Sequence, residues 1–234
     1  MQPDLKINAD FQQRVVIEPR DYRWIPSPMP GVERMMLDRI GGEVARATSI
    51  VRYAPDSHFA AHTHGGGEEY LVLQGTFADE HGEYPQGTYV RNPIGSRHTP
   101  RVGADGAMIF VKLHQFELED REQKVIATAH GVWQNSETIG IMRQALHRFG
   151  DELVALERWQ PQSSAGPLSC PGGKEMLVLE GCLYDEHQAY PKGSWLRLPA
   201  GSQQTPYTKA EGAVLYVKTG HLSTSTHRIQ ENSE

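Results

Sequence analysis

The sequence predicts an all-β protein that contains two similar domains in tandem. Three observations support this prediction. The 234-residue chain contains 23 glycines and 15 prolines, which is typical of a turn-rich architecture. Short apolar runs alternate with turn residues about every ten positions, the spacing expected of a β-sandwich or barrel. The C-terminal half also repeats the N-terminal half over most of its length.

The repeat is clearest where residues 75–100 align with residues 181–206, at an offset of 106. Half of the positions in this window are identical. Upstream the offset becomes 109, and Trp24 aligns with Trp133. We explain the change of offset by a three-residue deletion in the second copy, at the place that corresponds to residues 39–52.

The duplication predicts a first domain over residues 1–122 and a second over residues 123–234. The charged segment 118–124, LEDREQK, is typical of a linker between them.

Each copy contributes the same series of apolar segments, which we interpret as strands. They span 70–75 and 176–181, then 87–93 and 193–199, then 107–113 and 213–219. The segment 139–149, IGIMRQALHRF, could also form a helix. Its counterpart, 31–40, follows a proline-rich stretch, and both segments are equally compatible with strands.

Composition argues against several function classes. The formal net charge is −6 and no run of Lys or Arg occurs, which disfavours nucleic-acid or anionic-membrane partners. No apolar stretch approaches the roughly 20 residues that span a bilayer. The first ten residues contain no apolar segment to serve as a signal peptide. We interpret the two cysteines, Cys170 and Cys182, as free thiols, and we expect a cytoplasmic protein.

The repeat also separates structural residues from candidates for chemistry. A residue that both copies contain serves the fold, which both copies need. Residues present in one copy only are the candidates. This criterion assigns structural roles to three recurring pairs: His81 with His187, Glu69 with Glu175, and Arg91 with Arg197.

Four residues of the first copy are candidate metal ligands: His62, His64, Glu68 and His98. His62 and His64 are two apart on a predicted strand, so their side chains leave the same face. Three imidazoles and a carboxylate suit Zn, Fe, Mn, Ni or Cu(II). The second copy keeps the surrounding sequence but replaces the whole set, with Leu168, Cys170, Lys174 and Gln204. We expect Lys174 to reach solvent or to pair with an acid, because an unpaired buried charge is costly.

The spacing His62-x-His64-x3-Glu68-x6-Gly75 resembles the first motif of the cupin superfamily, and Gly87-x5-Pro93-x-Gly95-x2-His98 resembles the second. Val102 stands where the second motif usually has Asn. Residues 20–115 resemble the cupin domain of the ChrR anti-sigma factors, and residues 130–220 resemble a degenerate version. The resemblance implies two tandem jelly-roll cupin barrels, the first with zinc bound by the four candidate ligands.

This resemblance implies a metal-binding sensor of the ChrR type, which responds to oxidative stress or a small ligand and serves transcription-related regulation. The alternative is a metal-dependent dioxygenase that acts on a small chelating substrate of the dicarbonyl type. A structural bicupin with a residual metal is a third reading. ChrR proteins bind sigma factors through a separate N-terminal helical domain. Only about twenty residues precede the first cupin here, so we do not expect direct sigma-factor binding.

We therefore expect one divalent transition metal per chain, zinc by resemblance, with iron, manganese or nickel as alternatives. The expected partner is a small-molecule ligand or substrate, not a nucleic acid or a membrane. The sequence leaves the oligomeric state open, with a homodimer among the alternatives.

Overall fold

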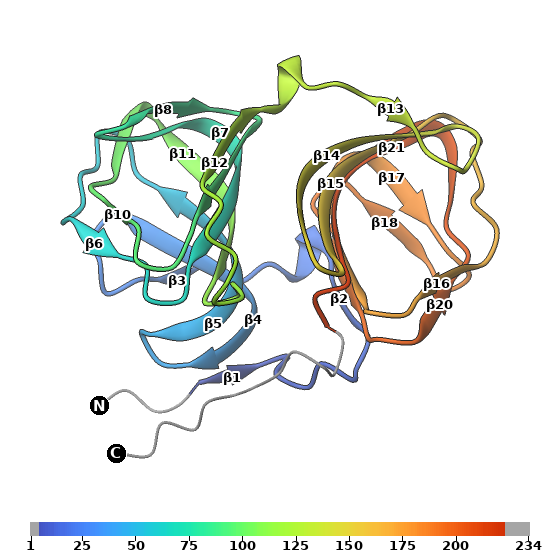
Figure 1. Cartoon of the computed structure of the whole chain (residues 1–234), viewed down its shortest axis with the longest axis horizontal. Helices are drawn as coiled ribbons and strands as arrows, with labels where there is room; N and C mark the ends of the chain where they lie inside the picture. Colours follow the sequence, from blue (N-terminus) through green and yellow to red (C-terminus); the bar gives the residue numbers. More distant parts are fainter. Residues whose placement is uncertain (1–4, 223–234) are drawn as a thin grey trace. The chain divides into compact units, whose positions relative to one another are not determined.

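The computed structural model describes residues 5–222, which form two compact units (Figure 1). Within these residues, the first unit comprises 5–9 and 22–131, and the second comprises 10–21 and 132–222. Both units are built from strands, and the helices of the described part are two short 3-10 turns. The all-β class and the two tandem barrels are as the sequence predicted. In the described part of the chain, no helix has the length and apolarity that crossing a membrane requires.

The first unit is a rolled antiparallel sheet with strand order β1-β4-β5-β11-β7-β9-β12, to which β3 and β8 add at β4 and β7, and β6 pairs with β10 separately. Its elements are β1 (Lys6–Ile7), β3 (Ile25–Pro26), β4 (Val32–Gly41), β5 (Ala45–Tyr53), β6 (His62–Thr63), β7 (Glu68–Asp79), β8 (Gly82–Pro85), β9 (Thr88–Asn92), β10 (Arg97–His98), β11 (Arg101–Leu113), β12 (Lys124–Ala127) and the turn η2 (Thr128–His130).

The second unit repeats this plan with order β13-β14-β15-β21-β17-β19-β2, with β18 on β17 and β16 paired with β20. Its elements are β2 (Val15–Ile17), the turn η1 (Pro19–Asp21), β13 (Gln134–Asn135), β14 (Ile141–Phe149), β15 (Glu152–Trp159), β16 (Leu168–Cys170), β17 (Lys174–Tyr184), β18 (Ala189–Pro191), β19 (Trp195–Leu198), β20 (Ser202–Gln204) and β21 (Tyr207–Thr219). The segment 139–149, which the sequence allowed to be a helix or a strand, contains the strand β14.

The three-residue difference between the copies lies in one hairpin, shared between its turn and the two strand ends that border it. Residues 42–44 connect β4 to β5, whereas only residues 150–151 connect β14 to β15. The turn is one residue shorter in the second copy, and the ends of β14 and β15 that border it are each one residue shorter than those of β4 and β5. The strand pairing farther from the turn is the same in both barrels.

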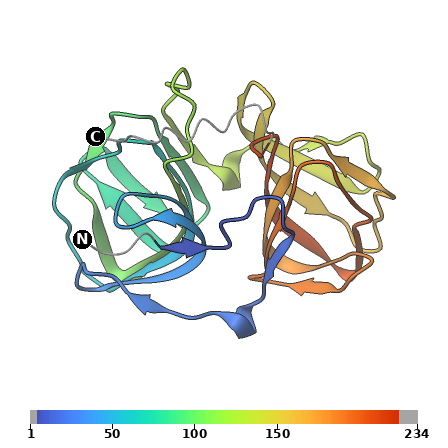
Figure 2. The same ribbon diagram turned by 90° about the horizontal axis from the view of Figure 1, so that it is seen from below.

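Each unit is completed by a strand from the start of the other repeat. The strand β12 pairs with β9, with Lys124 opposite Arg91. In the same register β2 pairs with β19, with Val15 opposite Arg197, and Figure 2 shows this blue strand against the second unit. The two compact units are therefore not contiguous in sequence: each of these two arm strands, β2 and β12, pairs into the unit that the other repeat forms.

Two recurring arginines hold these arms. Arg91 is 1% exposed and pairs with Glu69 at 2.7 Å and with Asp120. Arg197 donates to the backbone carbonyl of Asp10 at 2.9 Å. The structural role expected of Arg91 is confirmed. Asp120 is buried although it lies inside the segment predicted to be a linker, so that part of the segment is docked on the first unit.

The interior of the first barrel is lined by alternate residues of its strands, including Tyr70, Val72, Phe77 and Ile109. Gly75 and Gly181 occupy the same bend of the corresponding strands, with φ of 69° and 68°. A Cβ at Gly75 would lie 2.0 Å from the carbonyl oxygen of Gly106. Only glycine fits there, which explains why both copies contain it.

Candidate metal centre

The four candidate ligands come from neighbouring elements at one end of the first barrel. The short strands β6 and β10 pair so that His62 lies directly opposite His98. His64 follows β6, and Glu68 is the first residue of β7. Strand pairing thus brings together residues that lie up to 36 positions apart in sequence.

The three imidazoles meet at one point. The His62 and His64 rings have centroids 5.0 Å apart, and each lies 4.8 Å from the His98 ring. One nitrogen from each lies within 4.8 Å of the others, which is an arrangement that could hold a metal ion. Glu68 Oε2 lies 3.3 Å from His64 Nε2 and 3.8 Å from His98 Nε2. His64, Glu68 and His98 are buried, whereas His62 is exposed.

The hydrogen bonds of the rings leave their Nε2 atoms facing one another. His62 Nδ1 lies 3.1 Å from the carbonyl oxygen of Ala60, and His98 Nδ1 lies 3.1 Å from Asp79 Oδ2. Both partners are acceptors, so each Nδ1 carries the hydrogen of a neutral ring. The two Nε2 atoms, 3.2 Å apart, then turn lone pairs toward each other. A cation between them would remove this conflict.

The distances suit one shared ion. Two ligand atoms that each lie about 2.1 Å from an ion are separated by about 3.0 Å at a right angle and about 3.4 Å at a tetrahedral angle. The 3.2 Å between His62 Nε2 and His98 Nε2 lies in this range. His64 Nε2 is buried without a hydrogen-bond partner among the described residues. The donor set therefore fits a divalent metal.

The burial of these groups favours metal binding at neutral pH. Burial, with a smaller contribution from the charges of His62 and His114, lowers the pKa of His64 to about 4. Burial likewise lowers the pKa of His98. Both rings are therefore neutral near pH 7, which is the form that binds metals. Burial raises the pKa of Glu68, which favours its neutral form. A metal cation beside the carboxyl group would have the opposite effect and favour the ionised form.

The glycine turn after His64 allows close packing behind the centre. A Cβ at Gly66 would lie 2.3 Å from His114 Nδ1, and one at Gly67 would lie 2.4 Å from the ring of Phe116. The turn thus rests directly on these two side chains, which fixes the position of Glu68 at the start of β7.

Two residues of the site were missed by sequence reasoning. Asp79 contacts His98 Nδ1, but both copies contain this aspartate, and the criterion of recurrence assigned it to the fold. Asn92 is buried and donates through Nδ2 to Glu68 Oε2 at 3.2 Å. Its counterpart is Leu198, so the same criterion could have identified Asn92.

The second barrel places the replacement residues in the same positions. Leu168 lies opposite Gln204 in the pair of β16 and β20, just as His62 lies opposite His98. Cys170, Lys174 and Gln204 are buried. None of the three can reproduce a set of imidazole nitrogens, so this barrel has lost the donor chemistry while keeping the frame.

The buried Lys174 has an acidic neighbour. Glu157 is buried where the first copy has Val51, and it pairs with Arg143 at 2.7 Å. Although burial opposes it, the charges of Lys174 and Arg143 lower the pKa of Glu157. The charge of the buried Lys174 therefore acts on an acid that is itself paired with Arg143. Cys170 and Cys182 are free thiols, and burial raises the pKa of Cys170.

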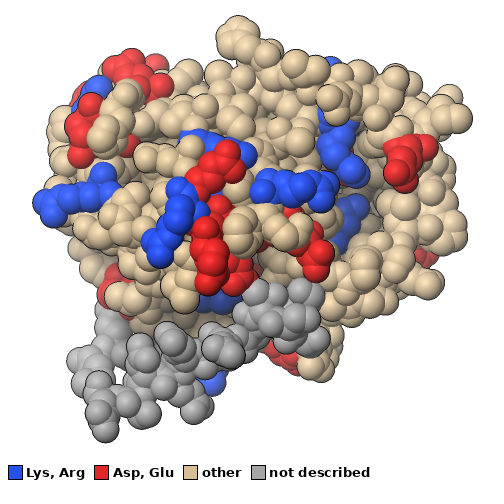
Figure 3. Space-filling view, in the orientation of Figure 1, with Lys and Arg blue, Asp and Glu red and all other residues tan. Residues whose placement is uncertain are grey.

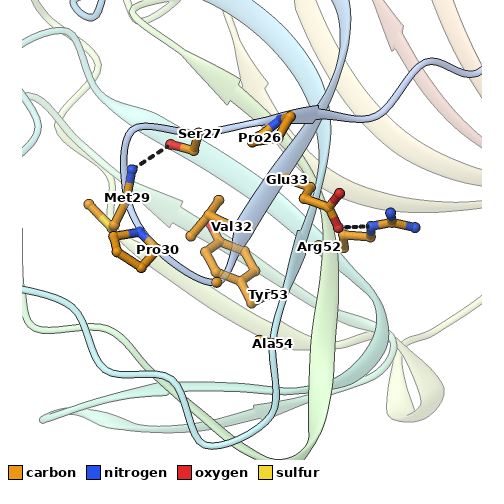
Figure 4. A pocket seen from close by; sticks show the side chains of 10 residues that line it. Pro26, Ser27, Met29, Pro30, Val32, Glu33, Arg52, Tyr53 and Ala54 are labelled. Atoms are coloured by element: carbon orange, nitrogen blue, oxygen red, sulfur yellow. Dashed lines mark hydrogen bonds and ion pairs between the residues drawn. The ribbon is translucent and has the colours of Figure 1, made fainter.

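An aromatic cluster lies beside the metal centre inside the first barrel. Tyr53 packs on Phe59 and Phe77, with ring centroids 5.4 and 5.2 Å apart, and Phe77 reaches the His98 ring at 6.4 Å. Tyr53 also lines an open pocket of about 410 Å³ at the turn between β3 and β4 (Figure 4). The ion pair of Glu33 and Arg52 also lines this pocket. The three histidines of the candidate metal centre are not among its lining residues.

Comparison with known proteins identifies the family. The ChrR cupin-like domain model matches twice, over residues 12–117 and 121–223. The chain belongs to the ChrR cupin-like family. Both matches begin with the arm strands, so each repeat of the family pattern includes the segment that completes the other barrel. A search of the curated proteins found no match.

Solved structures share the cupin fold at low sequence identity. A candidate dioxygenase from Nostoc punctiforme has a TM-score of 0.74 and 15% identity, over 88% of this chain and 82% of that one. A nickel(II) complex of a pirin from Escherichia coli has a TM-score of 0.63 and 11% identity, over 88% and 99%. A mutant of Bacillus subtilis oxalate decarboxylase has a TM-score of 0.60 and 12% identity, over 89% and 77%.

Proposed function

We propose that the first barrel binds one divalent transition metal through His62, His64, Glu68 and His98 and presents it to a small molecule, as a sensor of the ChrR type. The observation that carries this proposal is the opposed pair of Nε2 atoms of His62 and His98, 3.2 Å apart. His62 is exposed, so a small molecule could approach the metal from its side of the centre.

The other residues support the metal without binding it. Asn92 donates a hydrogen bond to the Glu68 carboxylate. This bond restricts the rotation of the carboxylate and holds it facing the histidines. Zinc is the proposed metal by family resemblance, and imidazole nitrogens and a carboxylate oxygen are ligands that zinc binds in proteins. Iron, manganese and nickel are compatible with the same donors.

A dioxygenase is the second candidate, and Tyr70 favours it. The hydroxyl of Tyr70 is buried and has no hydrogen-bond partner among the described residues. Burial raises the pKa of Tyr70, with a further contribution from the charge of nearby Glu68, so the group remains a hydrogen-bond donor. An anionic oxygen of a chelating substrate would satisfy it. The second barrel has Met176 at this position.

The proposed partner is a small-molecule ligand or substrate. We propose a cytoplasmic location for the protein, because free thiols such as Cys170 and Cys182 persist in that compartment. Nucleic acid and direct sigma-factor contact are not part of the proposal. The net charge is −6, and Figure 3 shows acidic and basic side chains interspersed on one face. A homodimer is compatible with this function.

Oxygen consumption distinguishes the two candidates. The full chain is loaded anaerobically with Fe(II) or Zn(II) and mixed with a panel of β-dicarbonyl and other chelating enolates in an oxygen electrode. If the protein is a sensor, neither form consumes oxygen above the metal-free chain. Substrate-dependent turnover by the Fe(II) form that is lost in Tyr70→Phe would contradict the sensor assignment and establish the dioxygenase.

A further inference from the structure

Asp79 is held by contacts on both carboxylate oxygens. Its Oδ1 accepts hydrogen bonds from the backbone N–H groups of His81 at 2.8 Å and Gly82 at 3.2 Å, and from the hydroxyl of Tyr84 at 2.9 Å. Its Oδ2 lies 3.1 Å from His98 Nδ1. The side chain is buried, and three donors on one oxygen fix the direction of the other.

We propose that Asp79 is a positioning residue that holds His98 in the tautomer whose Nε2 lone pair faces the metal; this rests on the proposed metal site. An ionised carboxylate only accepts hydrogen bonds, so His98 Nδ1 carries the hydrogen. The lone pair on Nε2 then points toward His62 Nε2 and Glu68. Such outer partners orient ligating histidines and increase their basicity.

The second barrel contains the same device without a metal. Asp185 Oδ1 accepts from the backbone of His187 and Gln188 and from the hydroxyl of Tyr190. Its Oδ2 accepts from Gln204 Nε2 at 3.1 Å. The turn is therefore a fold element of both copies, and the first copy uses its second oxygen to orient a ligand.

Asp79→Asn separates the two roles of the side chain. An asparagine Oδ1 still accepts from the three donors of the turn. Its NH₂ group then faces His98 and requires an acceptor at Nδ1, which places the hydrogen on Nε2. Flipping the amide would turn the NH₂ group against three donors, so the reversed orientation is unfavourable. Asp185→Asn is the matched control, because it changes the equivalent turn next to Gln204.

The first readout uses the metal-free full chain and does not depend on metal binding. Two-bond proton–nitrogen NMR correlations report which imidazole nitrogen carries hydrogen, and His98→Gln assigns the signal. Near pH 7.5 we expect the Nδ1–H tautomer of His98 in the wild type and in Asp185→Asn, and the Nε2–H tautomer in Asp79→Asn. A wild-type His98 in the Nε2–H tautomer would overturn the proposal even if the variant does not fold.

The second readout is affinity for Zn(II), measured by competition with a chromophoric chelator. We expect a Kd that is about 10- to 100-fold higher in Asp79→Asn, and an unchanged Kd in Asp185→Asn. An unchanged Kd in a folded Asp79→Asn overturns the positioning role. The wild type could bind no metal while His98 still has the Nδ1–H tautomer in the wild type and the Nε2–H tautomer in Asp79→Asn. In that case the proposed metal site fails, but the orientation of His98 by Asp79 stands.

Discussion

His64→Ala should leave the chain folded and almost free of metal. His64 is buried, and its Nε2, which has no hydrogen-bond partner among the described residues, lies 3.3 Å from Glu68 Oε2. Its loss removes a ligand, so the affinity should fall by more than the roughly 10- to 100-fold typical of an outer partner. Metal content after dialysis against a weak chelator measures this effect.

Cys170→Ala is the matched control for this variant, because Cys170 occupies the position of His64 in the second barrel. It also replaces a buried side chain by a methyl group, and we expect it to keep the full metal content. An unchanged metal content in His64→Ala would show that the ligand set is wrong.

Deleting residues 123–234 should destabilise the first barrel itself. The deletion removes β12, which pairs with β9, and Thr128, whose hydroxyl and backbone N–H both donate to the Gly87 carbonyl oxygen. With a net contribution of about 1 kcal/mol per hydrogen bond, a few kcal/mol are lost. In a domain of this size the melting temperature should fall by on the order of 10 °C.

A second truncation isolates the arm. The fragment 1–131 lacks the second barrel but keeps β12 and η2, so it should melt higher than the fragment 1–122. Thermal unfolding of both fragments and of the full chain makes the comparison. A fragment 1–122 that is soluble, monomeric and as heat-resistant as the full chain would show that residues 123–234 do not stabilise the first barrel.

The prediction of the fold from the sequence rested mainly on the internal repeat. Two copies of one pattern fix which residues both barrels need, as Gly75 and Gly181 illustrate, and the strands follow from the same alignment. The arms were missed for a physical reason. The edge strands β9 and β19 present similar partners, Arg91 and Arg197, so local sequence does not show which barrel receives which arm.

The candidate site was predictable in part. His62, His64 and His98 differ together between the copies, and the structure brings them to one point. Asn92 also differs between the copies, with Leu198 as its counterpart, but it occupies a position that the second motif leaves unspecified. Asp79 could not be found by comparing copies, because one side chain serves a turn and a ligand at once.

The most direct test of the central claim is the position of the metal in crystals of the native full chain, by anomalous diffraction on both sides of the absorption edge of the metal found by elemental analysis. We expect one peak per chain, about 2.0–2.2 Å from the imidazole nitrogens of His62, His64 and His98 and bound by Glu68. No peak should lie among Leu168, Cys170, Lys174 and Gln204. A native chain with its metal in the second barrel, and none near His62, would contradict the account.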